Sequence, residues 1–347
     1  MKRLRLQLIM GLVLALVVTS GLYAFSYLTA TATMGVTVAG TEIATYEPSA
    51  AQPKWNSILT PVEETENLRP DAAGDETNIS SQEPDSGAHW DKVAEETPDG
   101  DTTYVYTSSS DWQEDLYNIA DHSTGVGTIS YVKVYVICRA DASPTQTSIY
   151  THIKTNETED NGSEETITIS YATYSYQWDY NPQTLDDWTW SEIDALQIGV
   201  GLRESATGQN TRCTQIYAEV GYEAPPLSGN VPTGDLFDIT PHSEFTGDLA
   251  VRVYLTNSGD LVKAYQSLNM NLFLEGSVEA GETPNYRTLT LENGWVTFNL
   301  KDYTPGNTYT LSVTGDDYQL VSRDTSEWEE GWTVTPELYC QIVQRGE

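Results

Sequence analysis

The sequence predicts an all-β protein, with two antiparallel β-sandwich domains behind an N-terminal transmembrane or signal helix. Short runs that alternate apolar and polar residues with a period of two, separated by turn residues, indicate the sandwiches. A long apolar run directly after the first basic residues indicates the helix. The Pro, Gly and Ser content of "EAPPLSGNVPTGD" divides the β-rich part, so we expect one domain over residues 68–223, a linker over 224–234 and a second domain over 235–347.

The N-terminal apolar run predicts export. Lys2, Arg3 and Arg5 precede an apolar stretch over residues 6–28, and a helix of that length can cross a hydrocarbon core of ~30 Å. The basic residues stay on the cytoplasmic side, which places the rest of the chain on the extracellular face of the cytoplasmic membrane. We expect residues 1–32 to be a retained anchor, and small residues near position 30 leave cleavage and secretion as the alternative.

Residues 33–67 are expected to hold a short strand followed by a stalk. From residue 47 this stretch contains prolines, small residues and acids without periodicity, which is typical of a linker. The first large domain is therefore expected to begin at residue 68.

Strand patterns recur through both halves. In the first half, "TISYVKVYVICRA" sets Val132, Val134 and Val136 on one face, and the runs "LQIGVGLR" and "CTQIYAEVGY" alternate in the same way. In the second half, "RTLTLENGWVTFNL" places two alternating runs on either side of Asn293-Gly294, a pair that favours a tight hairpin turn. We expect these two runs to form a hairpin of the second domain.

The stretch "YATYSYQWDYNPQTLDDWTW", residues 171–190, is rich in aromatic rings. Tyr174, Tyr176, Trp178 and Tyr180 share one parity, while Thr, Ser, Gln and Asp occupy the other. Because those polar residues are poor core material, we interpret the rings as a wall of the core rather than as a sugar platform.

Four aromatic residues are candidates for ligand binding. Trp188 and Trp190 follow the loop "NPQTLDD", and loops often hold binding residues. Tyr180 and Trp112 are further candidates for stacking on sugar rings. The alternative for each residue is an ordinary packing role, because buried aromatic residues outnumber functional ones.

Structural calcium is the one cofactor hypothesis. Asp99 and Asp101 flank a glycine in "PDGDTT", and carboxylate oxygens in a flexible turn suit Ca²⁺. The spacing is shorter than a complete EF-hand loop, so an ordinary Asp-Gly turn is the alternative.

The three cysteines allow one disulfide. Cys138 and Cys213 lie in the first predicted domain and Cys340 in the second, so the first two are the natural pair. Cys213 has the parity opposite to Ile216, so a bond requires a bulge or a strand end. An unpaired cysteine could equally be buried and inert.

The charge of the chain argues against one class of partner. With Asp+Glu 51 and Lys+Arg 17 the net charge is −34, which repels phosphate backbones and so excludes nucleic acid as an expected partner. Solubility, adaptation to high salt and capture of divalent cations are three explanations for the acidity.

The motifs of common catalytic chemistries are missing from the sequence. The histidines are scattered, none of them in a paired metal-ligand spacing, and there is no nucleophile elbow, P-loop or dinucleotide-binding fingerprint. The many acids leave open a carboxylate pair suited to glycoside hydrolysis. We expect a protein without catalytic activity.

Segments of both halves and of the leader resemble known families. "HWDKVAEETPDGDTTYVYTSSSDWQEDLYNI", "YNPQTLDDWTWSEIDALQIGVGLR" and "RCTQIYAEVGYEA" resemble uncharacterised jelly-roll domains of phage structural proteins and secreted microbial surface proteins. This resemblance spans most of residues 68–223; it implies display or assembly and carries over no catalytic residue. The second half is similar to immunoglobulin-like or fibronectin-like sandwiches, which bears on the fold alone.

The leader "LVLALVVTSGLYAFSYLTATATMGVTVAG" resembles that of fibre-forming proteins of the TasA and camelysin type. The resemblance implies that a strand near Val36 and Val38 pairs with a neighbouring subunit.

These observations predict an exported, membrane-anchored cell-surface protein with a structural or adhesive role. The expected partners are the membrane, through the N-terminal helix, and further copies of the chain, envelope proteins or glycans. An extracellular carbohydrate-binding module is the first alternative, and a secreted glycoside hydrolase-like enzyme is the second.

Overall fold

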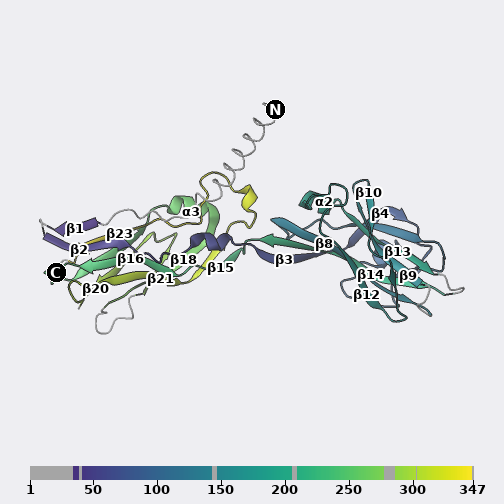
Figure 1. Ribbon diagram of the computed structural model, residues 1–347, viewed down its shortest axis with the longest axis horizontal. Helices are drawn as coiled ribbons and strands as arrows, with labels where there is room; N and C mark the ends of the chain where they lie inside the picture. The colour runs from purple at the N-terminus through teal and green to yellow at the C-terminus, as the bar shows by residue number, and fades with distance from the viewer. Residues whose placement is uncertain are drawn as a thin grey trace, which may run out of the picture. The chain divides into compact units, whose positions relative to one another are not determined.

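The computed structural model describes residues 34–38, 41–142, 147–204, 209–276, 286–301 and 303–345. They form an all-β protein with several antiparallel sheets, as the period-two patterns predict, and the sheets are consistent with β-sandwiches (Figure 1). The chain divides into two compact units. We call residues 61–224 the inserted unit, and the described residues up to 60 together with those from 225 onward the terminal unit.

The predicted membrane anchor, residues 1–32, lies outside the described residues. In the part of the chain that is described, no helix has the length and apolar character needed to cross a membrane.

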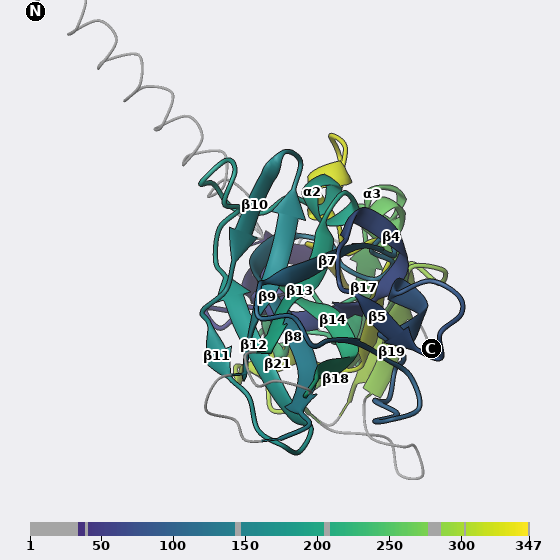
Figure 2. The same cartoon turned by 90° about the vertical axis from the view of Figure 1, so that its right-hand side faces the viewer.

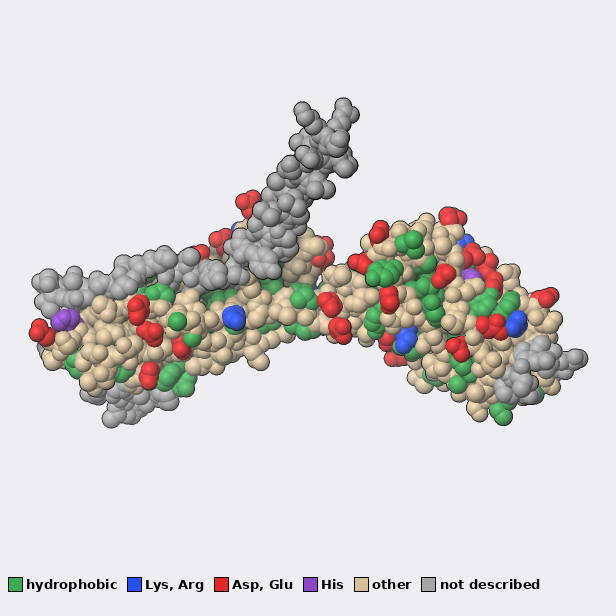
Figure 3. All heavy atoms as spheres, in the orientation of Figure 1, with side chains coloured by type: hydrophobic (Ala, Val, Ile, Leu, Met, Phe, Trp, Pro, Cys, Tyr) green, Lys and Arg blue, Asp and Glu red, His purple; other side chains and the backbone are tan. Residues whose placement is uncertain are grey.

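Carboxylate side chains are spread over the visible surface of both units, with few Lys and Arg side chains between them (Figure 3). The surface therefore matches the excess of 51 acidic over 17 basic residues in the sequence.

The inserted unit is built from two antiparallel sheets (Figure 2). One sheet has the strand order β10 (Thr158–Asn161), β9 (Thr147–Thr155), β13 (Gln197–Glu204), β7 (Gln113–Ile119) and β4 (Pro70–Thr77), with β11 (Glu165–Thr166) beside β9. The other has the order β12 (Ala172–Trp178), β8 (Thr128–Ala140), β14 (Thr211–Ala224), β6 (Tyr104–Thr107) and β5 (Ser81–Glu83), with β3 (Val62–Leu68) beside β14. Two short helical turns, η2 (Trp90–Lys92) and α2 (Trp190–Asp194), complete the unit.

Alternating residues of the two sheets supply the core of the inserted unit. Val132, Val134 and Val136 of β8 are buried in one cluster with Ile198 and Val200 of β13. The predicted alternation of these runs is therefore confirmed: in β8 buried apolar residues alternate with more exposed ones, and in β13 the large apolar residues alternate with buried glycines.

The aromatic stretch at residues 171–190 contributes to this core only in part. In β12, Tyr174, Tyr176 and Trp178 lie opposite Val136, Val134 and Val132 of β8, so the rings share the core face of the sheet. Trp178 is 5% exposed, whereas Tyr176 is 37% exposed. The burial is graded because β12 is the outermost strand of its sheet, where a ring has neighbours on one side only.

The terminal unit has a large and a small antiparallel sheet. The large one has the order β1 (Met34–Val38), β2 (Thr41–Pro48), β16 (Gly234–Pro241), β21 (Tyr309–Gly315), β18 (Tyr265–Leu274), β22 (Asp317–Leu320) and β15 (Ser228–Asn230), with β19 (Tyr286–Thr290) beside β18. The small one has the order β20 (Trp295–Leu300), β17 (Leu249–Leu255) and β23 (Leu338–Gln344). The helical segments are η1 (Trp55–Leu59), α3 (Ser258–Ala264) and η3 (Thr325–Glu327).

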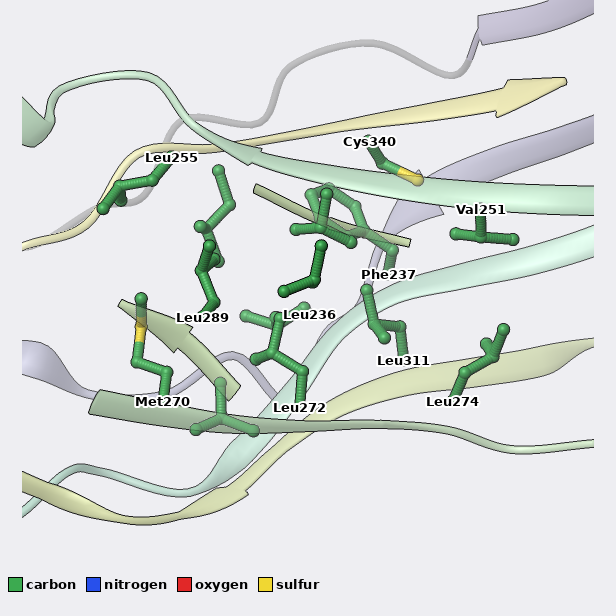
Figure 4. Close-up of a cluster of buried hydrophobic side chains, with 14 of the residues drawn as sticks. Leu236, Phe237, Val251, Leu255, Met270, Leu272, Leu274, Leu289, Leu311 and Cys340 are labelled. Atoms are coloured by element: carbon green, nitrogen blue, oxygen red, sulfur yellow. The ribbon is translucent and has the colours of Figure 1, made fainter. Parts of the chain in front are cut away.

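Apolar side chains from both sheets fill the core of the terminal unit (Figure 4). Leu272 of β18 and Leu311 of β21 come from the large sheet, and Val251 of β17 and Cys340 of β23 come from the small one. The small sheet therefore has one face on the core and one face away from it, which follows from the two-residue period of its strands.

Residues 41–60 belong to the core of the terminal unit and do not form a stalk. β2 pairs with β16, and Ile43 and Trp55 are 1% and 3% exposed. Ile58 of η1 lies in the same buried cluster. The end of the expected stalk, residues 62–67, belongs to strand β3 (Val62–Leu68) of the inserted unit. The sequence of this segment suggests a stalk because its apolar residues are widely spaced and show no period, and the residues they pack against are distant in the chain.

The expected hairpin around Asn293-Gly294 is also wrong. β19 pairs with β18 in the large sheet, whereas β20 pairs with β17 in the small one, so the turn joins two different sheets. The Asn293 side chain binds the backbone of Thr288 and Thr290, and the Gly294 carbonyl accepts from the Leu255 N–H (2.8 Å). These bonds direct the chain from one sheet into the other, immediately before Trp295.

Replacement of Ile43 by alanine tests the place of the N-terminal segment in the core. We expect Ile43→Ala to lower the free energy of unfolding of the terminal unit by about 2–5 kcal/mol, because it leaves a cavity in a packed core. Chemical denaturation of the full chain, followed by tryptophan fluorescence, measures this change. The matched control is Val262→Ala, on the exposed side of α3, with an expected change within about 0.5 kcal/mol. An Ile43→Ala effect as small as that of the control would contradict the core assignment.

Candidate functional site

Two of the predicted ligand-stacking residues have structural contacts around α2. Trp188 is 3% exposed, and its indole N–H donates to the Trp178 carbonyl (3.2 Å), which makes it a core residue. Trp190 is half-buried and donates its indole N–H to the Gly127 carbonyl (3.0 Å). Its ring centroid lies 4.7 Å from that of His122. These contacts fix both indoles, so neither presents an open face comparable to that of a free surface ring.

The other two candidates lie in different surroundings. The Trp112 ring contacts the Tyr150 ring (4.4 Å between centroids), and the Arg203 guanidinium lies 4.6 Å from its centroid. Tyr180, just after β12, is 59% exposed. Among the described residues, no ring contact joins any two of the four candidates. The structure therefore does not bring them together into one site.

The residues predicted to hold calcium are engaged by donors from the protein. Asp99 Oδ1 accepts from the Thr103 N–H (3.1 Å) and from the Thr214 hydroxyl (3.2 Å). Asp101 Oδ1 accepts from Arg139 Nη2 (2.9 Å) and from Arg212 Nη1 (3.2 Å). Nowhere in the described ranges do three His, Cys, Asp or Glu side chains gather closely enough to hold a metal ion. Calcium binding by Asp99 and Asp101 stays a prediction.

The arginine contacts also decide the protonation of Asp101. Desolvation acts to raise the pKa of this carboxyl, but the hydrogen bonds from Arg139 and Tyr171 and the charges of Arg139 and Arg212 outweigh it, so the pKa lies below its ordinary value. The ionised carboxylate is thereby favoured in a guanidinium cluster, which is a structural role that needs no metal ion.

The two candidate cysteines lie directly opposite each other. Cys138 of β8 pairs in register with Cys213 of β14, and the register shifts between Cys213 and Gln215. This irregularity is the bulge that the parity of Cys213 requires. Both thiols are buried, and all three cysteines are free in this structure. Burial and the neighbouring Cys213 thiol raise the pKa of Cys138 well above its ordinary value, so the Cys138 thiol is a poor nucleophile in the folded protein.

An exposed row of three aromatic rings crosses the small sheet of the terminal unit. Tyr254 of β17 lies opposite Trp295 of β20 on one side and opposite Tyr339 of β23 on the other. The ring centroid of Tyr254 lies 6.3 Å from that of Trp295 and 6.2 Å from that of Tyr339. Trp295 is 54% exposed and Tyr339 is 43% exposed. We call these three residues the aromatic row.

The strand period places the aromatic row on the outer face of the sheet. The residues that flank Tyr254 along β17 are buried in the core, so Tyr254 and Arg252 point away from it. The neighbouring positions on the same face form a polar row, in which Arg252 lies opposite Thr297 and Gln341. The Tyr254 hydroxyl donates to Gln341 Oε1 (3.2 Å), which links the two rows.

This face combines flat apolar surfaces with hydrogen-bonding groups. Trp and Tyr rings supply large rigid contact areas, and residues of these types dominate the energy of many interfaces. The amide of Gln341 and the hydroxyl of Thr297 can bond to polar groups of a ligand. The arrangement is therefore suited to binding a partner that has both apolar and hydroxyl-rich surfaces.

The sequence contains a partial signal for the aromatic row. Each of the three strands has a ring at a position of polar parity: Tyr254 between Val253 and Leu255, Trp295 before Val296, and Tyr339 between Leu338 and Cys340. An aromatic residue on the polar side of an amphipathic strand is a candidate for surface binding. The pattern within each strand does not reveal that the three strands are neighbours.

Comparisons with known proteins assign no relationship. No family model matches the chain, and no curated protein is detectably similar to it.

We expect Cys138 and Cys213 to be linked in a chain that is exported to an oxidising compartment. Their opposed positions fit the separation that a disulfide needs, and the bond must form before burial suppresses the thiolate. Peptide mapping without reductant should give one cross-linked peptide pair, and Cys340 should be alkylated after denaturation. The matched control is the same chain made in a reducing cytoplasm, with all three cysteines alkylated. Three alkylated cysteines in the exported chain would exclude the bond.

Proposed function

We propose that this chain is an exported cell-surface protein that acts by adhesion, with the aromatic row as its contact surface. The observation that supports this proposal is the exposure of Trp295 and Tyr339 on either side of Tyr254 on one sheet face. Exposed rings gathered on one face favour a binding partner, since contact with a partner removes their apolar surface from water.

The leader of the sequence supports the location. Its basic residues and the apolar run at 6–28 have the layout of a membrane anchor, which would hold the β-rich part on the extracellular face. An acidic exterior with a net charge of −34 is compatible with a crowded extracellular setting.

The strand order supports a finer description of the fold. In the inserted unit, two six-stranded sheets, one containing β12-β8-β14-β6 and the other β10-β9-β13-β7, share one core, and we infer from this two-sheet order that the unit is a jelly roll. We infer that the terminal unit is an immunoglobulin-like sandwich completed by the N-terminal strands. Both architectures are common in display and adhesion, although a fold by itself does not determine a function.

Adhesion assays on cells that express the full chain test this function. We expect Trp295→Ala and Tyr339→Ala each to weaken adhesion to polysaccharide-coated surfaces by about tenfold, because each removes a stacking ring worth about 1.4 kcal/mol. Neutral and acidic polysaccharides are both presented. The matched control is Tyr286→Ala, which removes a ring that is 49% exposed in the large sheet. Adhesion that is unchanged in both row variants would refute the proposal.

Assembly into a filament is a second candidate function. β1 is the last strand in the order of the large sheet, paired with β2 on one side. An edge strand offers backbone groups for pairing with another chain, and the leader resemblance implies the same use of residues 34–38.

Proline substitution in β1 tests assembly. Gly35→Pro and Val36→Pro each remove one N–H in the part of β1 that pairs regularly with β2, where successive N–H groups point to opposite edges, so one variant blocks the outer edge. We expect negative-stain electron microscopy of the full chain to show filaments that are lost in that variant. Circular dichroism of both variants confirms folding. Filaments that persist in both variants, or native protein that stays monomeric, would exclude assembly through β1.

A further inference from the structure

Arg252 stands next to the aromatic row and has no partner among the residues that the structure describes. It lies on the outer face of β17, two residues before Tyr254, and opposite Thr297 and Gln341. Among the residues that the structure describes, its guanidinium takes part in no ion pair, hydrogen bond or ring contact. An arginine without a partner is notable in a chain with three acidic residues for each basic one, 51 against 17.

Other arginines of the chain form ion pairs with carboxylates of the protein. Arg139 and Arg212 share Asp101 and Asp141, and Arg203 pairs with Glu164. In those cases the positive charge is already matched by carboxylates of the protein. The charge of Arg252 is available to a ligand, and a guanidinium is the side chain best suited to bidentate recognition of a carboxylate.

The positions of Arg252 and the aromatic row fit one extended ligand. Two residues along a strand separate Arg252 from Tyr254 by about 7 Å, and the diagonal neighbours Trp295 and Tyr339 are within reach of a long side chain. Hydroxyl and amide groups of Thr297 and Gln341 lie beside the arginine. Apolar stacking, hydroxyl recognition and one positive charge are therefore combined on a single sheet face.

We propose that this face binds an acidic polysaccharide whose sugar rings bear carboxylates. The apolar faces of the sugar rings stack on Trp295, Tyr254 and Tyr339, and a ring carboxylate pairs with Arg252. This inference rests on the adhesive function proposed above and specifies its ligand class. Sugars meet all three features of the face at once, whereas an acidic protein segment would use the arginine without needing the flat row.

The acidic body of the protein does not prevent this pairing. At ~0.15 M salt the screening length is about 8 Å, so carboxylates elsewhere on the surface are largely screened from a bound ligand. The contact between Arg252 and a ligand carboxylate acts at hydrogen-bond distance and is retained.

Calorimetric titration of the full chain in detergent micelles, at physiological salt, tests the proposal. The probes are a galacturonic acid hexamer and its methyl-esterified form, which has the same rings without the charges. We expect the native chain to bind the acid form at least about tenfold more tightly. Arg252→Gln should abolish this preference and leave binding of the ester unchanged. Trp295→Ala should weaken binding of both forms.

The controls distinguish binding of an acidic polysaccharide from adhesion through the aromatic row in general. Arg287→Gln removes an arginine of β19 in the large sheet and should bind like the native chain, and thermal melting confirms that each variant is folded. Equal affinity of the native chain for both hexamers would overturn the role of Arg252 while leaving adhesion through the aromatic row intact. Absence of binding to either hexamer would overturn the acidic ligand. If, in addition, Arg252→Gln abolished self-association measured by sedimentation, the face would belong to a second copy of the chain.

Discussion

The position of β17 between β20 and β23 is the constraint on which the candidate binding face depends. A strand places successive side chains on opposite faces, so the same seven residues supply both core and surface. Leu249, Val251 and Val253 anchor the strand in the core of the terminal unit. This anchoring fixes the register of β17, because a slip by one residue would bury Arg252 and Tyr254 in place of the apolar residues. The positions of the side chains on the outer face are therefore as well defined as those in the core.

The terminal unit is interrupted by a complete second unit, and the strand pairing explains why this is tolerated. β3 and β14, which begin and end the inserted unit, are antiparallel neighbours, with Val62 opposite Ala224. The two ends of the insertion are therefore close together, and the terminal unit has only a short gap to bridge. The entropy of closing a long loop grows slowly with its length, and a folded insertion with adjacent ends lowers that cost further.

Arginine charges are organised differently in the two units. In the inserted unit, Arg139 and Arg212 are matched by Asp101 and Asp141 and stack near tyrosine rings, so the positive charges serve internal structure. On the small sheet of the terminal unit, Arg252 lies beside exposed rings and has no matching carboxylate within the described part of the chain. An arginine that is paired with carboxylates of the protein belongs to a structural network, whereas an unpaired arginine can bind a carboxylate of a ligand.

The sequence by itself determined the all-β fold class and, for several strands, which residues share the buried face. The alternation of Val132, Val134 and Val136, and the shared parity of the rings around Trp178, depend on the two-residue period of a strand, which is a local property. The bulge required by the parity of Cys213 could be anticipated in the same way. Such inferences need no knowledge of which strands are neighbours.

Only the tertiary structure decided which strands are neighbours. Ile43 and Trp55 lie in a stretch that resembles a linker until β2 is seen to pair with β16. Asn293-Gly294 favours a hairpin locally, yet hydrogen bonds from distant residues direct the chain into a second sheet. Tyr254, Trp295 and Tyr339 are far apart along the chain, and the register of three strands makes them one surface. Pairing between distant segments is set by packing and hydrogen bonds over the whole unit, so it leaves little trace in a local pattern.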